Sequence, residues 1–143
     1  MAQLKISAAQ MVAAARARIS EVEAVDLIAR LADADQAAGL VVVDLRDRRE
    51  REREGFIPGS FHCPRGMLEF WVDPDSPYFK PVFAQDKTFV LHCASGWRSA
   101  LAAATLLDMG FPVAHLREGF STWAAQGGPV DRYPDQKPDR GLG

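Results

Sequence analysis

The residues around Cys93 have the types and spacing of an activated thiol. Cys93 opens the run Cys-Ala-Ser-Gly-Trp-Arg-Ser, directly after the apolar stretch 88–92. Because Gly96 accepts a positive φ, the backbone can turn tightly and point successive N–H groups at one centre, as an anion-binding nest does. A helix that starts after the loop adds free N–H groups and the positive end of its dipole, and Arg98 adds a positive charge. These features favour a thiolate and predict a nucleophile in an oxyanion cradle.

We expect the cradle to consist of the residues that follow the nucleophile: Ala94, Ser95, Gly96, Trp97, Arg98 and Ser99. A cysteine after a strand is more often a small buried apolar residue. The strand-to-helix setting, with Gly and Arg at set distances from Cys93, favours the nucleophile instead. Trp97 either forms a wall of the pocket and influences which acceptor molecule can reach the thiol, or packs its ring on a neighbouring helix.

The elements around this loop alternate between strands and helices. Buried-strand patterns occupy 40–44 and 88–92, with shorter strands at 61–63 and 113–116. Helices are expected at 5–17, 66–72, 99–109 and 118–126. Residues 20–23 read as a capping box for a further helix that ends near Asp33, before a turn at 35–39. This alternation predicts an α/β domain with a mostly parallel sheet, whose ligands bind at the carboxyl ends of strands.

The composition indicates one ordinary globular domain. The chain has 143 residues and a formal net charge of -2, which gives no support for a nucleic-acid partner. No apolar run reaches the ~18 residues of a membrane span. With only two cysteines, no CxxC and no Cys/His cluster, we expect no metal, no cofactor and a cytoplasmic protein with reduced thiols. The expected divisions are a helical extension at 1–20, the domain at 21–130 and a poorly ordered tail at 131–143.

Four segments, in order, resemble the rhodanese-like family. Asp44-Leu45-Arg46 is similar to its Asp-x-Arg element, and 55–60 to its Gly-His-Ile-Pro-Gly-Ala segment. Residues 93–99 match its active-site loop, and 119–123 its Gly-Phe-x-x-Trp. Phe56 and Glu118 depart from the family's histidine and glycine, at positions not expected to touch the reaction.

The resemblance implies a central, mostly parallel five-stranded sheet flanked by helices, with an extra N-terminal helix, and a single-domain thiosulfate sulfurtransferase. Cys93 would take a sulfane sulfur from a small anionic donor such as thiosulfate and hold it as a persulfide. It would then pass the sulfur to cyanide, a thiol or a protein acceptor. The loop amides would cradle the persulfide, and Arg98 would bind the donor's anion or brace the loop. Asp44 and Arg46 would form a structural charge network near the loop, or a plain surface ion pair.

Two other functions stay open. Relatives that resemble phosphatases and arsenate reductases use Cys-x5-Arg, whereas four residues separate Cys93 from Arg98 here. The shorter loop suits a sulfur atom better than a tetrahedral phosphoryl group. A non-enzymatic module that binds a partner or senses redox state is the other alternative, although inactive modules commonly lack the cysteine.

Three further side chains are secondary candidates. Arg65 could attract an anionic donor, and Glu69 could pair with Arg98 or act as a local base; the alternative is a short amphipathic helix over the sheet. Cys63 is either a resolving cysteine or a buried small residue, and the former needs Cα atoms within about 7 Å of each other. The three histidines, His62, His92 and His115, are expected to be structural or to lie behind the site. The charged run 48–54 is expected to be a solvated face.

Overall fold

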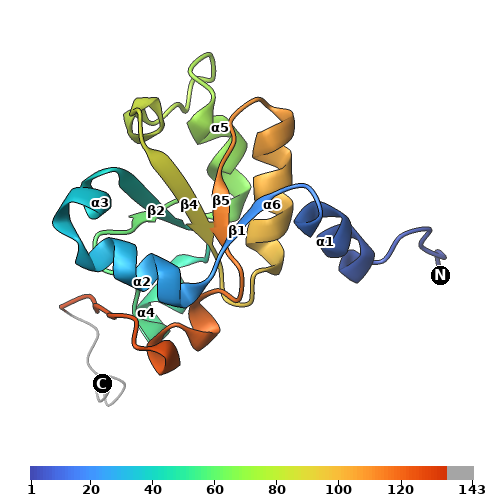
Figure 1. Cartoon of the computed structure of the whole chain (residues 1–143). Helices are drawn as coiled ribbons and strands as arrows, with labels where there is room; N and C mark the ends of the chain where they lie inside the picture. The colour runs from blue at the N-terminus through green and yellow to red at the C-terminus, as the bar shows by residue number, and fades with distance from the viewer. Residues whose placement is uncertain (135–143) are drawn as a thin grey trace, which may run out of the picture.

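Five parallel strands form one sheet in the computed structural model, which describes residues 1–134 (Figure 1). The strand order is β1-β5-β4-β2-β3. The strands are β1 (Ser20–Val22), β2 (Leu40–Asp44), β3 (Phe61–His62), β4 (Thr88–His92) and β5 (Ala114–Leu116). The two strongest apolar runs of the sequence therefore lie next to each other at the centre. The predicted α/β fold with a five-stranded sheet is confirmed, and every pairing is parallel.

Helices cover both faces of this sheet (Figure 1). The α-helices are α1 (Ala8–Arg16), α2 (Ala24–Ala32), α3 (Ala34–Ala38), α4 (Arg48–Glu54), α5 (Leu68–Val72) and α6 (Trp97–Asp108). Short 3-10 helices occupy Arg65–Met67, Pro81–Ala84, Phe120–Thr122 and Ala124–Gln126. The single helix predicted for 118–126 is therefore wrong, because Gly119, at φ 74°, starts a tight turn that the chain completes in two short 3-10 segments.

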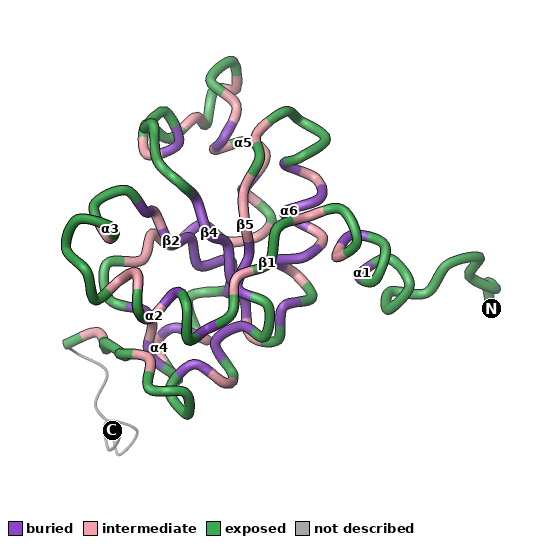
Figure 2. The backbone as a smooth tube through the Cα atoms, viewed as in Figure 1, coloured by how far each residue is buried: buried purple, intermediate pink, exposed green. Residues whose placement is uncertain are grey.

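The core has two layers, one on each side of the sheet. Val43 and Leu91 join the layer under α5 and α6, whereas Val42 and Val90 join the layer under α2. Most residues of β2 and β4 are buried, as Figure 2 shows, and alternate residues of a strand point to opposite faces, so both sides of each central strand are covered. The predicted N-terminal helix, α1, lies outside α6 and packs small side chains against it: Val12, Ala15, Ala100 and Ala104.

The start of the domain differs from the prediction. Ser20–Val22 is not a capping box but strand β1, in register with β5 from Ala114 to Leu116. Pairing with β5 satisfies more backbone N–H and C=O groups than a local cap can, so this segment is extended. Helix α2 then begins after Glu23 without a side-chain cap. Asp33 ends α2 as expected but also caps α3, in the segment predicted to be a turn.

The two ends of the described chain differ from the prediction. Ser7 and Gln10 form a capping box for α1 that the sequence analysis missed. Asp131 pairs with Phe56, and the Tyr133 ring packs on Phe56. Ordered contacts thus extend past residue 130, and the rest of the predicted tail, 135–143, lies outside the described residues. Within residues 1–134, no helix has the length and apolarity that crossing a bilayer requires.

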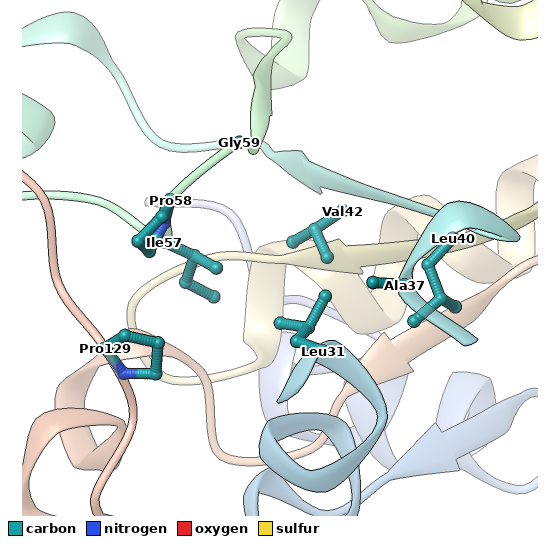
Figure 3. A pocket seen from close by; sticks show the side chains of 8 residues that line it. All are labelled: Leu31, Ala37, Leu40, Val42, Ile57, Pro58, Gly59 and Pro129. Carbon is teal, nitrogen blue, oxygen red and sulfur yellow. The ribbon is translucent and has the colours of Figure 1, made fainter. Parts of the chain in front are cut away.

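A pocket of about 290 Å³ lies beside α2 and α3 on one face of the sheet (Figure 3). Its lining is mostly aliphatic: Leu31, Ala37, Leu40, Val42, Ile57, Pro58, Gly59 and Pro129. None of residues 93–99 contributes to it, so this pocket is separate from the loop after β4.

Candidate active site

The loop 93–99 lies at the carboxyl edge of the central strand β4. His92 ends the strand, Cys93 follows, and Trp97 begins α6, with Gly96 as its N-cap at φ 90°. Two flanking strands, β2 and β5, pair with β4. The carboxyl edge is where parallel sheets bind their ligands, and the position predicted for the nucleophile is therefore the one that the fold makes available.

The loop wraps its N–H groups around the sulfur of Cys93. The backbone N–H groups of Gly96 and Ser99 donate to Cys93 Sγ at 3.2 and 3.4 Å. The Cys93 thiol in turn reaches Ser99 Oγ at 3.5 Å. Trp97 and Arg98 open α6, where N–H groups have no intrahelical acceptor and the helix dipole is positive. Cys93 is only 1% exposed, so its sulfur is almost fully covered in this conformation.

Two glycines make this loop possible by allowing close backbone approach. A Cβ at Gly96 would lie 2.2 Å from the carbonyl oxygen of Arg117. A Cβ at Gly119 would lie 2.5 Å from the carbonyl oxygen of Ala94. Phe120 and Ser121 then donate their N–H groups to the carbonyls of Cys93 and Ala94. The Gly-Phe pair at 119–120 therefore anchors the beginning of the nucleophile loop.

Arg98 is held by a residue that the sequence analysis placed on a solvated face. Its two terminal nitrogens donate to the two carboxylate oxygens of Glu50 at 2.8 and 2.9 Å. These hydrogen bonds raise the pKa of Arg98 and lower the pKa of Glu50 from their ordinary values. Glu50 is itself fixed, since it completes the capping box of α4 with Asp47. Arg98 therefore pairs with Glu50 and not with Glu69, for which this pairing was one of the roles considered.

Asp44 and Arg46 form a fully buried pair. Arg46 donates to both oxygens of Asp44, from Nε at 3.0 Å and from Nη2 at 2.9 Å, and Arg51 adds a bond of 2.8 Å. Burial opposes the charge of Asp44, but His92 and Arg46 outweigh it and hold the pKa of Asp44 well below its usual range. Arg46 also lies 4.1 Å above the ring of Phe120, which ties the pair to the loop anchor. This geometry is that of the expected internal network and not of a surface pair.

Arg65 and Glu69 pair with each other at 2.8 Å across one helical turn. Both side chains are partly exposed, at 29% and 34%. Within the described part of the chain, no hydrogen bond or ion pair links either of them to residues 93–99. Trp97 is 47% exposed at the start of α6, where its ring is available at the mouth of the loop.

Cys63 is buried in the apolar layer under α6. Burial raises the pKa of its thiol to about 12. Asp44 is in register with both His62 and His92, so Cys63 and Cys93 follow strands separated by β2. Two strand spacings put their Cα atoms roughly 10 Å apart, beyond the reach of a disulfide. The arrangement favours the buried-residue interpretation of Cys63.

Behind Ser99 lie His115, which was expected to be structural or to lie behind the site, and Glu21 and Arg16, which were not predicted to belong to it. Ser99 Oγ lies 2.8 Å from His115 Nδ1, and His115 Nε2 lies 2.9 Å from Glu21 Oε2. Arg16, from α1, lies 3.6 Å from the same carboxylate and donates to the Arg117 carbonyl at 3.2 Å. Glu21 and His115 are 94 residues apart, so no local pattern could have connected them.

A metal ion bound near Cys93 would change the chemistry of its thiol. Among residues 1–134, no three His, Cys, Asp or Glu side chains are grouped closely enough to hold a metal ion.

Comparison with known proteins connects this loop to a family. The Rhodanese-like domain model matches residues 23–126. A sulfurtransferase of Allochromatium vinosum is 30% identical over 113 residues, which cover 78% of this chain and 94% of that protein.

Solved structures share the fold. A protein of unknown function from Rhodopseudomonas palustris CGA009, described as a possible tyrosine phosphatase, is 51% identical with a TM-score of 0.85. The match covers 92% of this chain and 99% of that one. A thiosulfate sulfurtransferase from Pseudomonas aeruginosa is 23% identical with a TM-score of 0.61, over 82% of this chain and 20% of that one. An As-Sb reductase from Leishmania major is 23% identical with a TM-score of 0.59, over 84% and 91%. At these two lower identities the likeness concerns the fold alone.

Proposed function

The chain belongs to the rhodanese-like domain family, and from this membership we propose that it is a sulfurtransferase in which Cys93 carries sulfur as a persulfide. The observation that carries the proposal is the pair of backbone N–H groups, from Gly96 and Ser99, that donate to Cys93 Sγ. Such donors stabilise a thiolate before the reaction and the anionic persulfide after it. The relative named as a sulfurtransferase, at 30% identity, supports the same activity.

The reaction takes place in two displacements at sulfur. The Cys93 thiolate attacks the sulfane sulfur of a donor such as thiosulfate, the donor's S–S bond breaks, and sulfite leaves with the bonding electron pair. An acceptor such as cyanide or a thiolate then attacks the outer sulfur of the persulfide. The second S–S bond breaks, the acceptor leaves with the sulfur, and Cys93 is again a thiolate. A protein thiol can take the acceptor's place, since only its sulfur has to reach the loop.

Residues around the loop have separate roles in this proposal. The amides from Ala94 to Ser99 form the cradle, and Arg98 braces the loop through Glu50 while its partly exposed face attracts the donor's anionic group. Trp97, at the mouth, contacts the acceptor. Asp44 and Arg46 hold the neighbouring backbone in place. Arg65 and Glu69 lie farther out, where Arg65 contributes positive potential and no direct contact.

Mass spectrometry of the intact protein tests the proposal. Thiosulfate-treated protein is expected to gain the mass of one sulfur atom and to lose it on treatment with cyanide. Cys93→Ser should gain nothing, whereas the matched control Cys63→Ala should load sulfur normally. If the wild-type protein gains no sulfur from thiosulfate or from organic persulfides, the sulfurtransferase is excluded and a partner-binding module becomes the better interpretation.

A phosphatase is the second candidate, because the 51% identical structure is described as a possible tyrosine phosphatase. The spacing argues against it, since only four residues separate Cys93 from Arg98. A phosphoryl group presents three equatorial oxygens, and the shorter loop has fewer amides to meet them. Turnover of an aryl phosphate that depends on Cys93 would support the phosphatase instead.

A cytoplasmic location, expected from the reduced thiols, stays a prediction that fractionation of cells can check.

A further inference from the structure

A line of hydrogen bonds connects the sulfur of Cys93 to a carboxylate on β1. The Cys93 thiol donates to Ser99 Oγ at 3.5 Å, Ser99 Oγ lies 2.8 Å from His115 Nδ1, and His115 Nε2 lies 2.9 Å from Glu21 Oε2. Cys93, Ser99 and His115 are buried, and the Glu21 side chain is 25% exposed. The line therefore begins at the reacting atom and ends where water can reach it.

The direction of each hydrogen bond follows from what the groups can donate. A carboxylate only accepts, so His115 must carry its proton on Nε2 and donate it to Glu21. Nδ1 is then a free acceptor, and the Ser99 hydroxyl donates to it. The oxygen lone pairs of Ser99 are left to accept the Cys93 thiol proton. The donors on Cys93 and Ser99 thus point toward the imidazole, and the imidazole's own N–H points toward Glu21.

The charges around His115 are nearly balanced. Glu21 faces it from β1, and the Arg16 guanidinium, from α1, lies 3.6 Å from the Glu21 carboxylate. From α6 it meets the uncharged Ser99, and through Ser99 the thiol of Cys93 at the end of β4. Arg117, two residues after His115 and just past the end of β5, pairs instead with Glu23. Burial lowers the pKa of His115, and Glu21 partly offsets this effect, so the imidazole is neutral at physiological pH and can accept a proton.

We propose that His115, oriented by Glu21, is a positioning residue that takes up the thiol proton of Cys93 through Ser99. The thiol proton moves to Ser99 Oγ as the serine's own hydroxyl proton moves to His115 Nδ1. The products are a Cys93 thiolate, a neutral serine and an imidazolium paired with the Glu21 carboxylate. No atom or electron is gained or lost. As in other activated nucleophiles, a base (His115) is oriented by a third group (Glu21), but here Ser99 lies between the base and the nucleophile.

The use of this relay in turnover rests on the proposed sulfurtransferase function. When an acceptor attacks the outer sulfur of the persulfide, the S–S bond breaks and its electron pair stays on Cys93 Sγ. The imidazolium can return its proton to that thiolate by the same path. Both Glu21 and Arg16 precede the region 23–126 that the family model matches, so this chain's own N-terminal segment completes the relay.

The pH dependence of Cys93 alkylation tests the relay without any sulfur donor. The rate with iodoacetamide is measured from about pH 5 to about pH 10, and peptide mapping separates Cys93 from Cys63. His115→Asn can still accept a hydrogen bond from Ser99 but cannot take up a proton. We expect its profile to move up by roughly one pH unit, a tenfold lower rate at neutral pH, with the same limiting rate at high pH.

A pair of neighbouring carboxylates supplies the matched control. Glu21→Gln should move the profile in the same direction, whereas Glu23→Gln, which removes the same charge two residues away, should keep the wild-type profile. Glu21 has a partly exposed side chain, so this variant decides the matter even if His115→Asn fails to fold. Profiles of His115→Asn and Glu21→Gln that superpose on the wild type overturn the relay. Protein that shows these shifts but takes up no sulfur overturns the sulfurtransferase and keeps the relay.

Discussion

Glu50 holds Arg98 by two parallel hydrogen bonds, of 2.8 and 2.9 Å, that span 48 residues of sequence. The guanidinium of Arg98 is planar and rigid, so this fork fixes its orientation at the start of α6. Arg98 immediately precedes Ser99, whose N–H and hydroxyl both contact Cys93. The helix α4 therefore acts on the nucleophile through the placement of one arginine.

Arg98→Lys keeps the charge but cannot form the fork, and it is expected to slow sulfur loading several-fold. The free energy of unfolding should fall by about 1 kcal/mol, a small value because the pair is partly exposed. Loading is followed by mass spectrometry and stability by urea denaturation. Arg53→Lys is the control, since Arg53 pairs with Glu54 on the exposed side of α4 and its change should be close to neutral. Equal effects of the two changes would contradict a specific role for the fork.

Gly96→Ala should destabilise the protein far more than Gly110→Ala. Both glycines have a positive φ, 90° and 88°, but a Cβ at Gly96 meets backbone at 2.2 Å whereas one at Gly110 meets nothing within 4 Å. Gly110→Ala therefore carries only conformational strain, about 1 kcal/mol. Gly96→Ala adds a clash that only backbone movement relieves, for a total of about 3 kcal/mol. Urea denaturation of both variants measures the difference, and equal losses would show that the close approach costs nothing.

The position of the nucleophile loop could be predicted from local sequence, whereas the residues that reach the loop from distant segments could not. The strands 40–44 and 88–92 and the loop after them are contiguous patterns, so the position of Cys93 at a sheet edge followed from them. Glu50 and Glu21 reach the loop from distant segments, and nothing adjacent to them in sequence marks that role. The capping box predicted at Ser20 failed because strand pairing with Ala114 overrode a local preference.

Asp44→Asn should be among the most destabilising single changes in the domain. It leaves Arg46 and Arg51 buried without their common partner, which costs about 3–5 kcal/mol at neutral pH. The folded pKa of Asp44 lies below its unfolded value of about 3.9, so its stabilising contribution is present above about pH 4 and is lost as the pH falls below it.

Urea denaturation at several pH values measures this dependence. The wild-type advantage over Asp44→Asn should shrink on acidification below about pH 4. Asp86→Asn, at an exposed loop position, is the charge-matched control and should follow the wild type throughout. A gap between wild type and Asp44→Asn that stays constant with pH would argue that the carboxylate charge contributes nothing.

Cys63 should stay unmodified in the folded protein. Its thiol is buried and has a pKa of about 12, so almost none of it is thiolate at about pH 8, where alkylation depends on the thiolate. Peptide mapping after mild alkylation should find label on Cys93 alone, and on both cysteines once urea is added. Oxidation should likewise give no Cys63–Cys93 disulfide, and recovery of that linked peptide would restore the resolving role.

The two outer strands of the sheet, β1 and β3, are only three and two residues long. Short edges offer little unpaired backbone for another chain to pair with, which protects a sheet from aggregation. β1 also covers the side of β5 that would otherwise be open. A chain cut back to the family boundary at residue 23 would lose this cover and display β5 as a new edge. Its aggregation tendency should rise, so expressed fragments ought to begin before Ser7, where the cap of α1 is kept.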